Sequence, residues 1–129
     1  ITIINDVSSI EVSRDKLQTM QVMSAHGLPV PKTLLAKFPM SLSVVQDNFS
    51  LPIILKKSSG SQGKGIMIIR TYEQLEDLVD LLDTKEPLIF QEFIEASKGR
   101  DLRVLVVGGR IVASMMRIAQ KGFKANVHP

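Results

Sequence analysis

A glycine-rich segment between two short β-branched runs constrains the fold of this chain more than any other feature. The segment is Gly60-Ser61-Gln62-Gly63-Lys64-Gly65, and the two runs are residues 52–57 and 65–70. Runs this short, rich in isoleucine and bounded by proline and glycine, predict buried strands. We therefore expect a hairpin whose connection lets backbone amides approach an anion closely, because its side chains are small.

The order of the glycines separates this segment from the two best-known phosphate-binding loops. A dinucleotide-binding loop has the pattern Gly-x-Gly-x-x-Gly and runs into a helix, whereas this segment is Gly-x-x-Gly-x-Gly and runs into a strand. A Walker loop needs Lys-Ser or Lys-Thr after its last glycine, whereas Gly65 is followed by Ile66-Met67. The remaining functional interpretation is that the segment is a flexible lid over phosphates, with Lys56 as a nearby positive charge. The alternative is an ordinary solvated hairpin loop.

The rest of the chain predicts a mixed α+β fold, because its helices and strands do not alternate strictly. The expected helices are residues 13–26, 41–49 and 71–82, and the last has the clearest apolar stripe. The further expected strands are residues 33–36, 88–93, 102–107 and 111–116, the last two joined at Gly108-Gly109. A chain of 129 residues with 44% apolar residues can enclose one core.

Composition excludes several classes of protein. The chain has no cysteine, so disulfides, thiolate zinc sites and cysteine nucleophiles are excluded. Its apolar runs are far shorter than the roughly 20 residues of a membrane helix, and no secretory signal is visible. We expect a cytoplasmic protein with no membrane partner. From residue 98 onward, seven Lys and Arg residues accompany one acid, Asp101, which favours an anionic ligand, while few aromatics argue against direct nucleic-acid binding.

Charged residues surround Phe93 at the end of the strand expected over residues 88–93. Such a strand end is typical of backbone that meets a polar ring, such as a purine, between apolar side chains. The alternative is an edge strand that leaves the core.

The expected hairpin carries a second polar group. Alternation places Asp101 and Arg103 on one face. A two-residue turn at Gly108-Gly109 sends Arg117 to the opposite face, whereas a three-residue turn that includes Arg110 sets Arg117 across from Asp101. We expect the second register, because it leaves a nearly continuous apolar face on the other side. The resulting cluster is either a shared site or a surface ion-pair patch.

Six motifs in this order resemble the ATP-grasp ligases, and the closest branch is the RimK type, which adds glutamate to ribosomal protein S6. The motifs are Arg14-Asp15-Lys16-Leu17, Pro52-Ile53-Ile54-Leu55-Lys56, the segment Gly60 to Gly65, Gln91-Glu92-Phe93-Ile94, Gly99-Arg100-Asp101-Leu102-Arg103 and Asn126-Val127-His128. The resemblance covers nearly the whole chain. It implies an ATP-grasp fold with residues 32–94 as the small ATP-binding lobe and residues 95–129 as the start of the large catalytic lobe.

The resemblance implies an ATP-dependent ligase that phosphorylates a substrate carboxylate and lets an amine attack the acylphosphate. The implied phosphate contacts are Lys16, Lys56 and the lid Gly60, Ser61, Gln62, Gly63, Lys64 and Gly65. The implied contacts to adenosine are Glu92, Phe93 and Ile94 at adenine and Asp101 at ribose. Lys124, Ala125 and Asn126 fall on a further nucleotide-binding stretch. Lys124 stands where the family usually has arginine. Arg103 and Arg117 are the implied catalytic residues, placed at phosphoryl and acylphosphate oxygens.

In the family that this chain resembles, the ligands of Mg²⁺ or Mn²⁺ follow the Asn-x-His stretch, and an acceptor-binding domain precedes the ATP-binding part. We therefore expect an excerpt that does not turn over by itself, whose metal ligands lie beyond Pro129. The implied partners are ATP, glutamate, a protein acceptor such as ribosomal protein S6, and further copies of the same chain. Two alternatives stay open: an ATP-grasp ligase with a small-molecule acceptor, and a noncatalytic nucleotide sensor.

Overall fold

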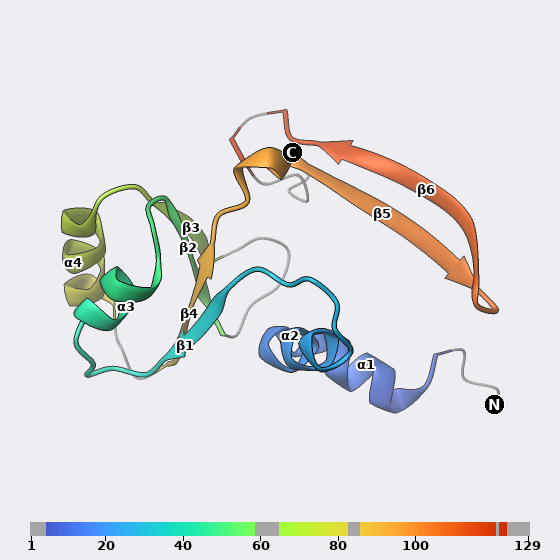
Figure 1. Ribbon diagram of the computed structural model, residues 1–129, viewed down its shortest axis with the longest axis horizontal. Helices are drawn as coiled ribbons and strands as arrows, with labels where there is room; N and C mark the ends of the chain where they lie inside the picture. Colours follow the sequence, from blue (N-terminus) through green and yellow to red (C-terminus); the bar gives the residue numbers. More distant parts are fainter. Residues whose placement is uncertain (1–4, 59–64, 83–85, 121, 124–129) are drawn as a thin grey trace. The chain divides into compact units, whose positions relative to one another are not determined.

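A computed structural model of the chain describes residues 5–58, 65–82, 86–120 and 122–123 (Figure 1). The described residues form two compact units. One unit comprises residues 5–58 and the described residues of Ile66–Phe93, and the other comprises Gly65 and the described residues from Ile94 onward. None of the helices formed by the described residues has the length and apolar character that crossing a bilayer requires.

The first unit is built on a four-stranded antiparallel sheet. Its strands are β1 (Thr33–Ala36), β2 (Ile53–Lys57), β3 (Ile66–Ile69) and β4 (Leu88–Glu92), arranged in the order β1-β4-β2-β3. The predicted pairing on either side of the glycine-rich segment is confirmed, since Ile53 lies opposite Ile69 and Lys56 lies opposite Ile66. Of these four strands, β4 is the last in sequence, and it lies between β1 and β2.

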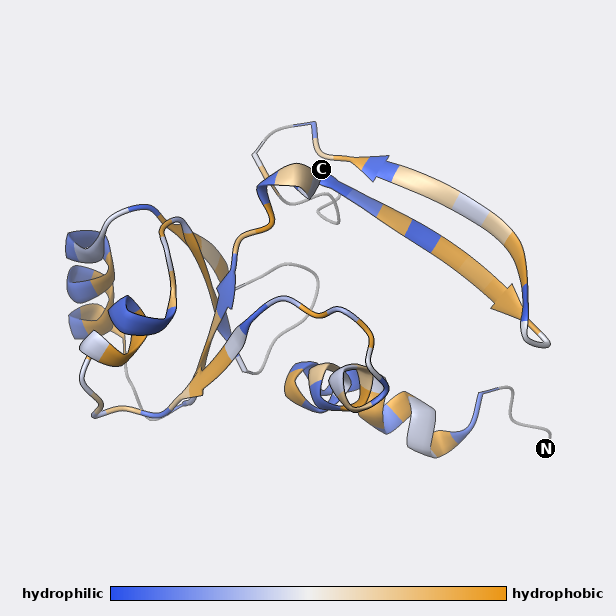
Figure 2. Cartoon of the chain, viewed as in Figure 1, coloured by the Kyte–Doolittle hydropathy of each residue, from blue (hydrophilic) through white to orange (hydrophobic). Residues whose placement is uncertain are grey.

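Two helices cover one face of this sheet. They are α3 (Ser43–Asn48) and α4 (Tyr72–Leu81), and the apolar side of α4 faces the sheet (Figure 2). The Thr71 hydroxyl accepts a hydrogen bond from the amide of Gln74 at 3.1 Å and so caps the start of α4. The buried core is formed by Ala36, Val45, Phe49, Ile53, Leu55, Ile69, Leu75, Leu88 and Phe90.

The helix expected over residues 13–26 begins later than predicted, as α2 (Lys16–Ala25), and a further helix that was not predicted, α1 (Val7–Arg14), precedes it. The break falls at Asp15, whose backbone is extended. Its carboxylate accepts hydrogen bonds from the amides of Leu17 at 2.8 Å and Gln18 at 2.9 Å. A side chain that satisfies the first free amides of a helix favours a helix start at that position, and this places Lys16 in the first turn of α2.

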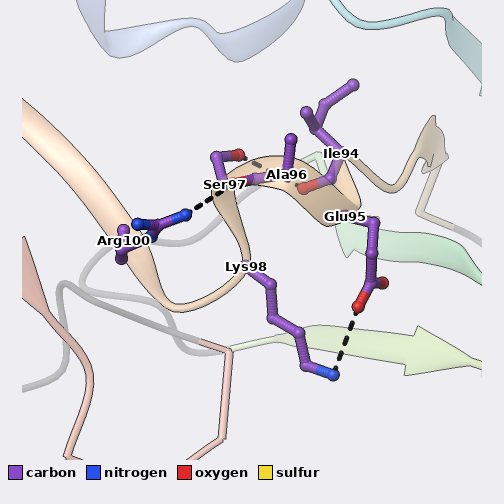
Figure 3. Close-up of polar contacts among 6 residues, drawn as sticks. All are labelled: Ile94, Glu95, Ala96, Ser97, Lys98 and Arg100. Carbon is purple, nitrogen blue, oxygen red and sulfur yellow. Dashed lines mark hydrogen bonds and ion pairs between the residues drawn. The ribbon is translucent and has the colours of Figure 1, made fainter.

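The second unit is a two-stranded antiparallel hairpin, β5 (Arg100–Val107) and β6 (Arg110–Ile118), preceded by the 3₁₀ turn η1 (Glu95–Ser97). Within that turn the Ser97 hydroxyl donates to the Ile94 carbonyl at 3.2 Å (Figure 3). Arg100 reaches back to the Ala96 carbonyl at 2.9 Å (Figure 3). These contacts connect the turn to the first residue of β5.

The predicted three-residue turn of this hairpin is wrong, but the register that it was meant to produce is confirmed. Gly108 and Gly109 form a two-residue turn with φ of +55° and +76°, and Val107 lies opposite Arg110. The pairing then shifts, because Leu105 lies opposite Ala113 while Val106 lies opposite Ile111. Val112 is the extra residue of a β-bulge, and this bulge returns Arg117 to a position opposite Asp101.

Two leucines of α4 provide a test of the core. Leu75 is 1% exposed and Leu81 is 83% exposed. We expect Leu75→Ala to lower the free energy of unfolding by about 2–5 kcal/mol, because it leaves a cavity against the sheet. We expect Leu81→Ala, the same substitution on an exposed residue, to change it by less than about 0.5 kcal/mol. Urea unfolding of both variants measures the difference, and equal losses would contradict this placement of α4.

Candidate functional site

Strand alternation places a polar group on the sheet face opposite α3 and α4. In β2 and β4 the side chains of Ile53, Leu55, Leu88 and Phe90 enter the core. Lys56 and Gln91 alternate with them and therefore lie on the other face. There they border a cavity of about 180 Å³, lined by Ser13, Lys16, Thr19, Met20, Thr33, Lys56, Ile89 and Gln91.

Two lysines from distant parts of the chain meet at this cavity. Lys56 comes from the end of β2 and Lys16 from the start of α2. The Lys16 ammonium donates to the carbonyl of Lys57 at 3.3 Å, which ties α2 to β2. The structure thus brings together the two lysines to which the family resemblance gives phosphate contacts.

The surroundings of Lys56 disfavour its charged form. Burial lowers the pKa of Lys56 below its ordinary value, and the positive charge of Lys16 lowers it further. None of the described residues that line the cavity is acidic. A bound anion would relieve both effects, because it would supply the missing negative charge beside two ammonium groups. The cavity is therefore suited to a phosphate or another compact anion.

Gln91 is the residue of this site that the sequence interpretation left without a role. Its side chain is only 7% exposed. Its Oε1 accepts a hydrogen bond from the Lys56 ammonium at 2.5 Å, and its Nε2 donates to the Thr33 hydroxyl at 2.9 Å and points to the Met20 sulfur at 4.0 Å. The sequence contains one indication of this role. Gln91 continues the apolar run of residues 88–90, and alternation places it on the same face of the strand as Ile89, which lies opposite Lys56.

Glu92 and Phe93, expected at adenine, border a different cavity. This cavity of about 310 Å³ is lined by Lys32, Asn48, Phe49, Ser50, Leu51, Pro52, Glu92 and Phe93. The backbone amide of Glu92 already donates to the carbonyl of Lys32 at 3.0 Å. Ile94, the third residue of this group, is 41% exposed and accepts the hydrogen bond from Ser97 described above. The side chains of Glu92 and Phe93 therefore do not line the lysine cavity.

The hairpin joins Asp101, Arg103 and Arg117 on one face, as the expected register requires. Arg117 binds both carboxylate oxygens of Asp101, from Nε at 2.6 Å and from Nη2 at 2.7 Å. Arg103 lies opposite Met115, two residues along from Asp101 on the same face. The hydrogen bonds from Arg117 lower the pKa of Asp101 more than any other effect, with a smaller contribution from the charge of Arg103. The pKa of Arg117 is raised, chiefly by its hydrogen bond to Asp101.

Most of the predicted lid lies outside the described residues. Those positions are Gly60, Ser61, Gln62, Gly63 and Lys64, and the same holds for Lys124, Ala125 and Asn126. Gly65 is described and has φ of +70°, a conformation that favours glycine directly before β3.

Among the described residues, no group of three or more His, Asp or Glu side chains is arranged to hold a metal ion.

The sequence matches the family described as RimK-like ATP-grasp domain over residues 13–129. A probable alpha-L-glutamate ligase of Vibrio vulnificus (strain YJ016) is 34% identical over 129 residues, which cover 98% of this chain and 43% of the relative. A probable alpha-L-glutamate ligase of Pasteurella multocida (strain Pm70) is 39% identical over 137 residues, which cover 99% of this chain and 42% of the relative. The chain thus spans less than half the length of these relatives.

Solved structures show the same fold. A RimK domain protein ATP-grasp from Sphaerobacter thermophilus matches with a TM-score of 0.71 and 17% identity, over 91% of this chain and 46% of that one. N5-carboxyaminoimidazole synthetase from Staphylococcus aureus, complexed with ADP, matches with a TM-score of 0.67 and 18% identity, over 92% of this chain and 32% of that one. The expected ATP-grasp fold is confirmed by these similarities.

The Asp101–Arg117 pair gives a prediction that depends on pH. A carboxylate whose folded pKa is depressed stabilises the fold above the ordinary carboxyl pKa, and this contribution is lost as the pH falls through the lowered value. We expect Arg117→Met to return the pKa of Asp101 toward its ordinary value, and Arg103→Met to raise it less. Carbon-13 NMR titration of the Asp101 carboxyl group measures both. An equal rise in the two variants would show that the hydrogen bonds are not the main cause.

Proposed function

Because the chain belongs to the RimK-like ATP-grasp family, we propose that it is the ATP-binding part of a ligase that joins a carboxylate to an amine. The observation that carries this proposal is the convergence of Lys16 and Lys56 on one cavity without an acidic lining residue among those described. Two ammonium groups beside one cavity favour a ligand with several negative charges, such as the phosphates of ATP. We take residues 32–94 as the small lobe and 95–129 as the start of the large lobe.

In the proposed reaction, a substrate carboxylate attacks the γ-phosphorus of ATP and ADP leaves. The acylphosphate is then attacked by an amine, which forms the amide bond and releases phosphate. Phosphoryl transfer depends on positioning and charge neutralisation more than on covalent help from the protein. Lys16 and Lys56 neutralise the phosphates of the bound nucleotide in this scheme.

The hairpin residues have complementary roles in the proposal. Arg103 and Arg117 contact phosphoryl and acylphosphate oxygens, for which a planar guanidinium with several donors is well suited. Asp101 contacts the ribose. Although both of its oxygens accept from Arg117, a carboxylate has about four lone-pair positions and can still accept a ribose hydroxyl.

The lid and the adenine contacts complete the nucleotide site. We assign Gly60, Ser61, Gln62, Gly63, Lys64 and Gly65 to a loop that covers the phosphates, and Lys124, Ala125 and Asn126 to a further nucleotide contact. A closed lid excludes the water that would hydrolyse an acylphosphate. Glu92, Phe93 and Ile94 hold adenine through backbone groups in this proposal, and Glu92 and Phe93 are not among the residues that line the lysine cavity.

For the substrates, we propose glutamate as the added amino acid and a protein such as ribosomal protein S6 as the acceptor. The names of the relatives, probable alpha-L-glutamate ligases, support glutamate. We place the reaction in the cytoplasm, where ATP is supplied.

A matched pair of substitutions tests the phosphate contact. Lys56→Met removes the buried ammonium, and we expect the affinity of the intact protein for ATP to fall by roughly 10- to 100-fold, the usual cost of losing a hydrogen bond to a charged group. Lys57→Met changes the next residue of β2, which is exposed and does not line the cavity. We expect Lys57→Met to leave the affinity nearly unchanged. Isothermal titration measures both, and similar losses would count against this site.

ADP release by the intact protein tests the reaction class. We expect release only when ATP, glutamate and an acceptor peptide are all present. ADP formed with small-molecule acceptors and not with peptides would favour the alternative acceptor class. Binding of ATP without ADP formation under any condition would favour a noncatalytic nucleotide sensor.

A further inference from the structure

A series of hydrogen bonds connects the Lys56 ammonium to the backbone just before the edge strand β1, at Pro31. The Lys56 ammonium donates to Oε1 of Gln91 at 2.5 Å, and Nε2 of Gln91 donates to the Thr33 hydroxyl at 2.9 Å. The Thr33 hydroxyl in turn donates to the carbonyl of Pro31 at 2.8 Å. The sheet register supports this arrangement, because Thr33 lies directly opposite Gln91 in the β1–β4 pair.

The number of protons on each group fixes which group donates in every hydrogen bond of this series. A threonine hydroxyl has one proton, and Thr33 gives it to the Pro31 carbonyl, which can only accept. The Thr33 oxygen is therefore free to accept, and the group of Gln91 that faces it must be the amino group. The oxygen of Gln91 then faces Lys56, whose ammonium can only donate. The two ends of the Gln91 amide are thus held by partners of opposite kind.

Burial makes this orientation expensive to lose. Gln91 is 7% exposed, so an amide proton without a partner would lack both water and a protein acceptor. Thr33 contributes the oxygen that prevents this. One proton of Lys56 is committed to Gln91, and its ammonium forms no other hydrogen bond with the described residues. Two protons therefore remain for a ligand in the cavity that Thr33, Lys56 and Gln91 line together.

We propose that Thr33 is a positioning residue of the nucleotide site, which holds Gln91 so that its oxygen orients the Lys56 ammonium toward the bound phosphate. This inference rests on the proposed function, because it specifies how that site is kept ready for ATP. Thr33 acts through Gln91.

The groups around Lys56 determine the sign of the expected effect. Lys16 on α2 is the titratable residue among those that line the cavity with Lys56. The neighbours from the sheet are Gln91 and Ile89 on β4 and Ile66 on β3, and none of them titrates. The hydrogen bond to Gln91 favours the charged form of Lys56, against burial and Lys16. Its loss should therefore lower the pKa of Lys56 further.

The test compares Thr33→Val, which keeps the shape and removes the hydroxyl, with Thr33→Ser, which keeps the hydroxyl. Competitive acetylation of the intact protein with trace acetic anhydride, analysed by mass spectrometry of the peptide containing Lys56, gives the titration of this lysine without any nucleotide. We expect Lys56 to titrate at lower pH in Thr33→Val than in wild type, and Thr33→Ser to match wild type. We also expect Thr33→Val to weaken ATP binding by roughly three- to tenfold, an effect of one lost hydrogen bond.

The two measurements separate failure of this inference from failure of the proposed function. If Thr33→Val leaves the Lys56 titration unchanged, or if Thr33→Ser shifts it equally, the positioning role is wrong. If the titration shifts as expected while the wild type does not bind ATP, the role of Thr33 stands and the nucleotide assignment fails. Gln91→Met removes the acceptor with little change of volume and should lower the pKa of Lys56 in the same direction. An unchanged titration in that variant would also overturn the inference.

Discussion

The alternation of side chains along β2 and β4 determines on which face of the sheet the polar side chains of these two strands lie. One face of these strands is buried by α3 and α4, and each fully buried aliphatic or aromatic side chain there stabilises the fold by about 1.5–3 kcal/mol. Because Ile53, Leu55 and Phe90 must enter this core, Lys56 and Gln91 have to lie on the opposite face. A slip of one residue would turn Lys56 into the core from β2, or Gln91 into the core from β4. The hydrophobic core thus fixes the position of the cation.

Local patterns in the sequence predicted much of this fold. The β-branched runs gave the β2–β3 pair, the apolar stripe gave α4, and alternation placed Asp101 and Arg103 on one face of the hairpin. Each of these depends on residues within one element or one turn. The fold class was also predictable, because six motifs in a fixed order resemble one family.

The errors and omissions have physical causes. The helix expected over residues 13–26 begins only at Lys16 because the Asp15 carboxylate caps α2. The turn of the hairpin was predicted wrongly. Setting Arg117 opposite Asp101 requires one extra residue on the second strand, and alternation does not show whether that residue lies in a longer turn or, as here, in a bulge at Val112. The pairing of Thr33 with Gln91 could not be predicted, because it requires that β4 lies between β1 and β2. Strand order depends on contacts between distant parts of the chain.

The lysine pair Lys16 and Lys56 and the arginine Arg117 differ in how their charge is balanced. Arg117 has a carboxylate partner, Asp101, that holds its guanidinium in a fixed plane. Among the described residues, the hydrogen-bond partner of the Lys56 ammonium is the neutral oxygen of Gln91, and Lys16 adds a second positive charge beside it. A paired arginine keeps its geometry whether or not a ligand is present, whereas an unbalanced pair of lysines gains most when an anion arrives. On this basis the lysine pair is suited to capture an anionic ligand, whereas Arg117 is suited to present its remaining donors in a fixed orientation.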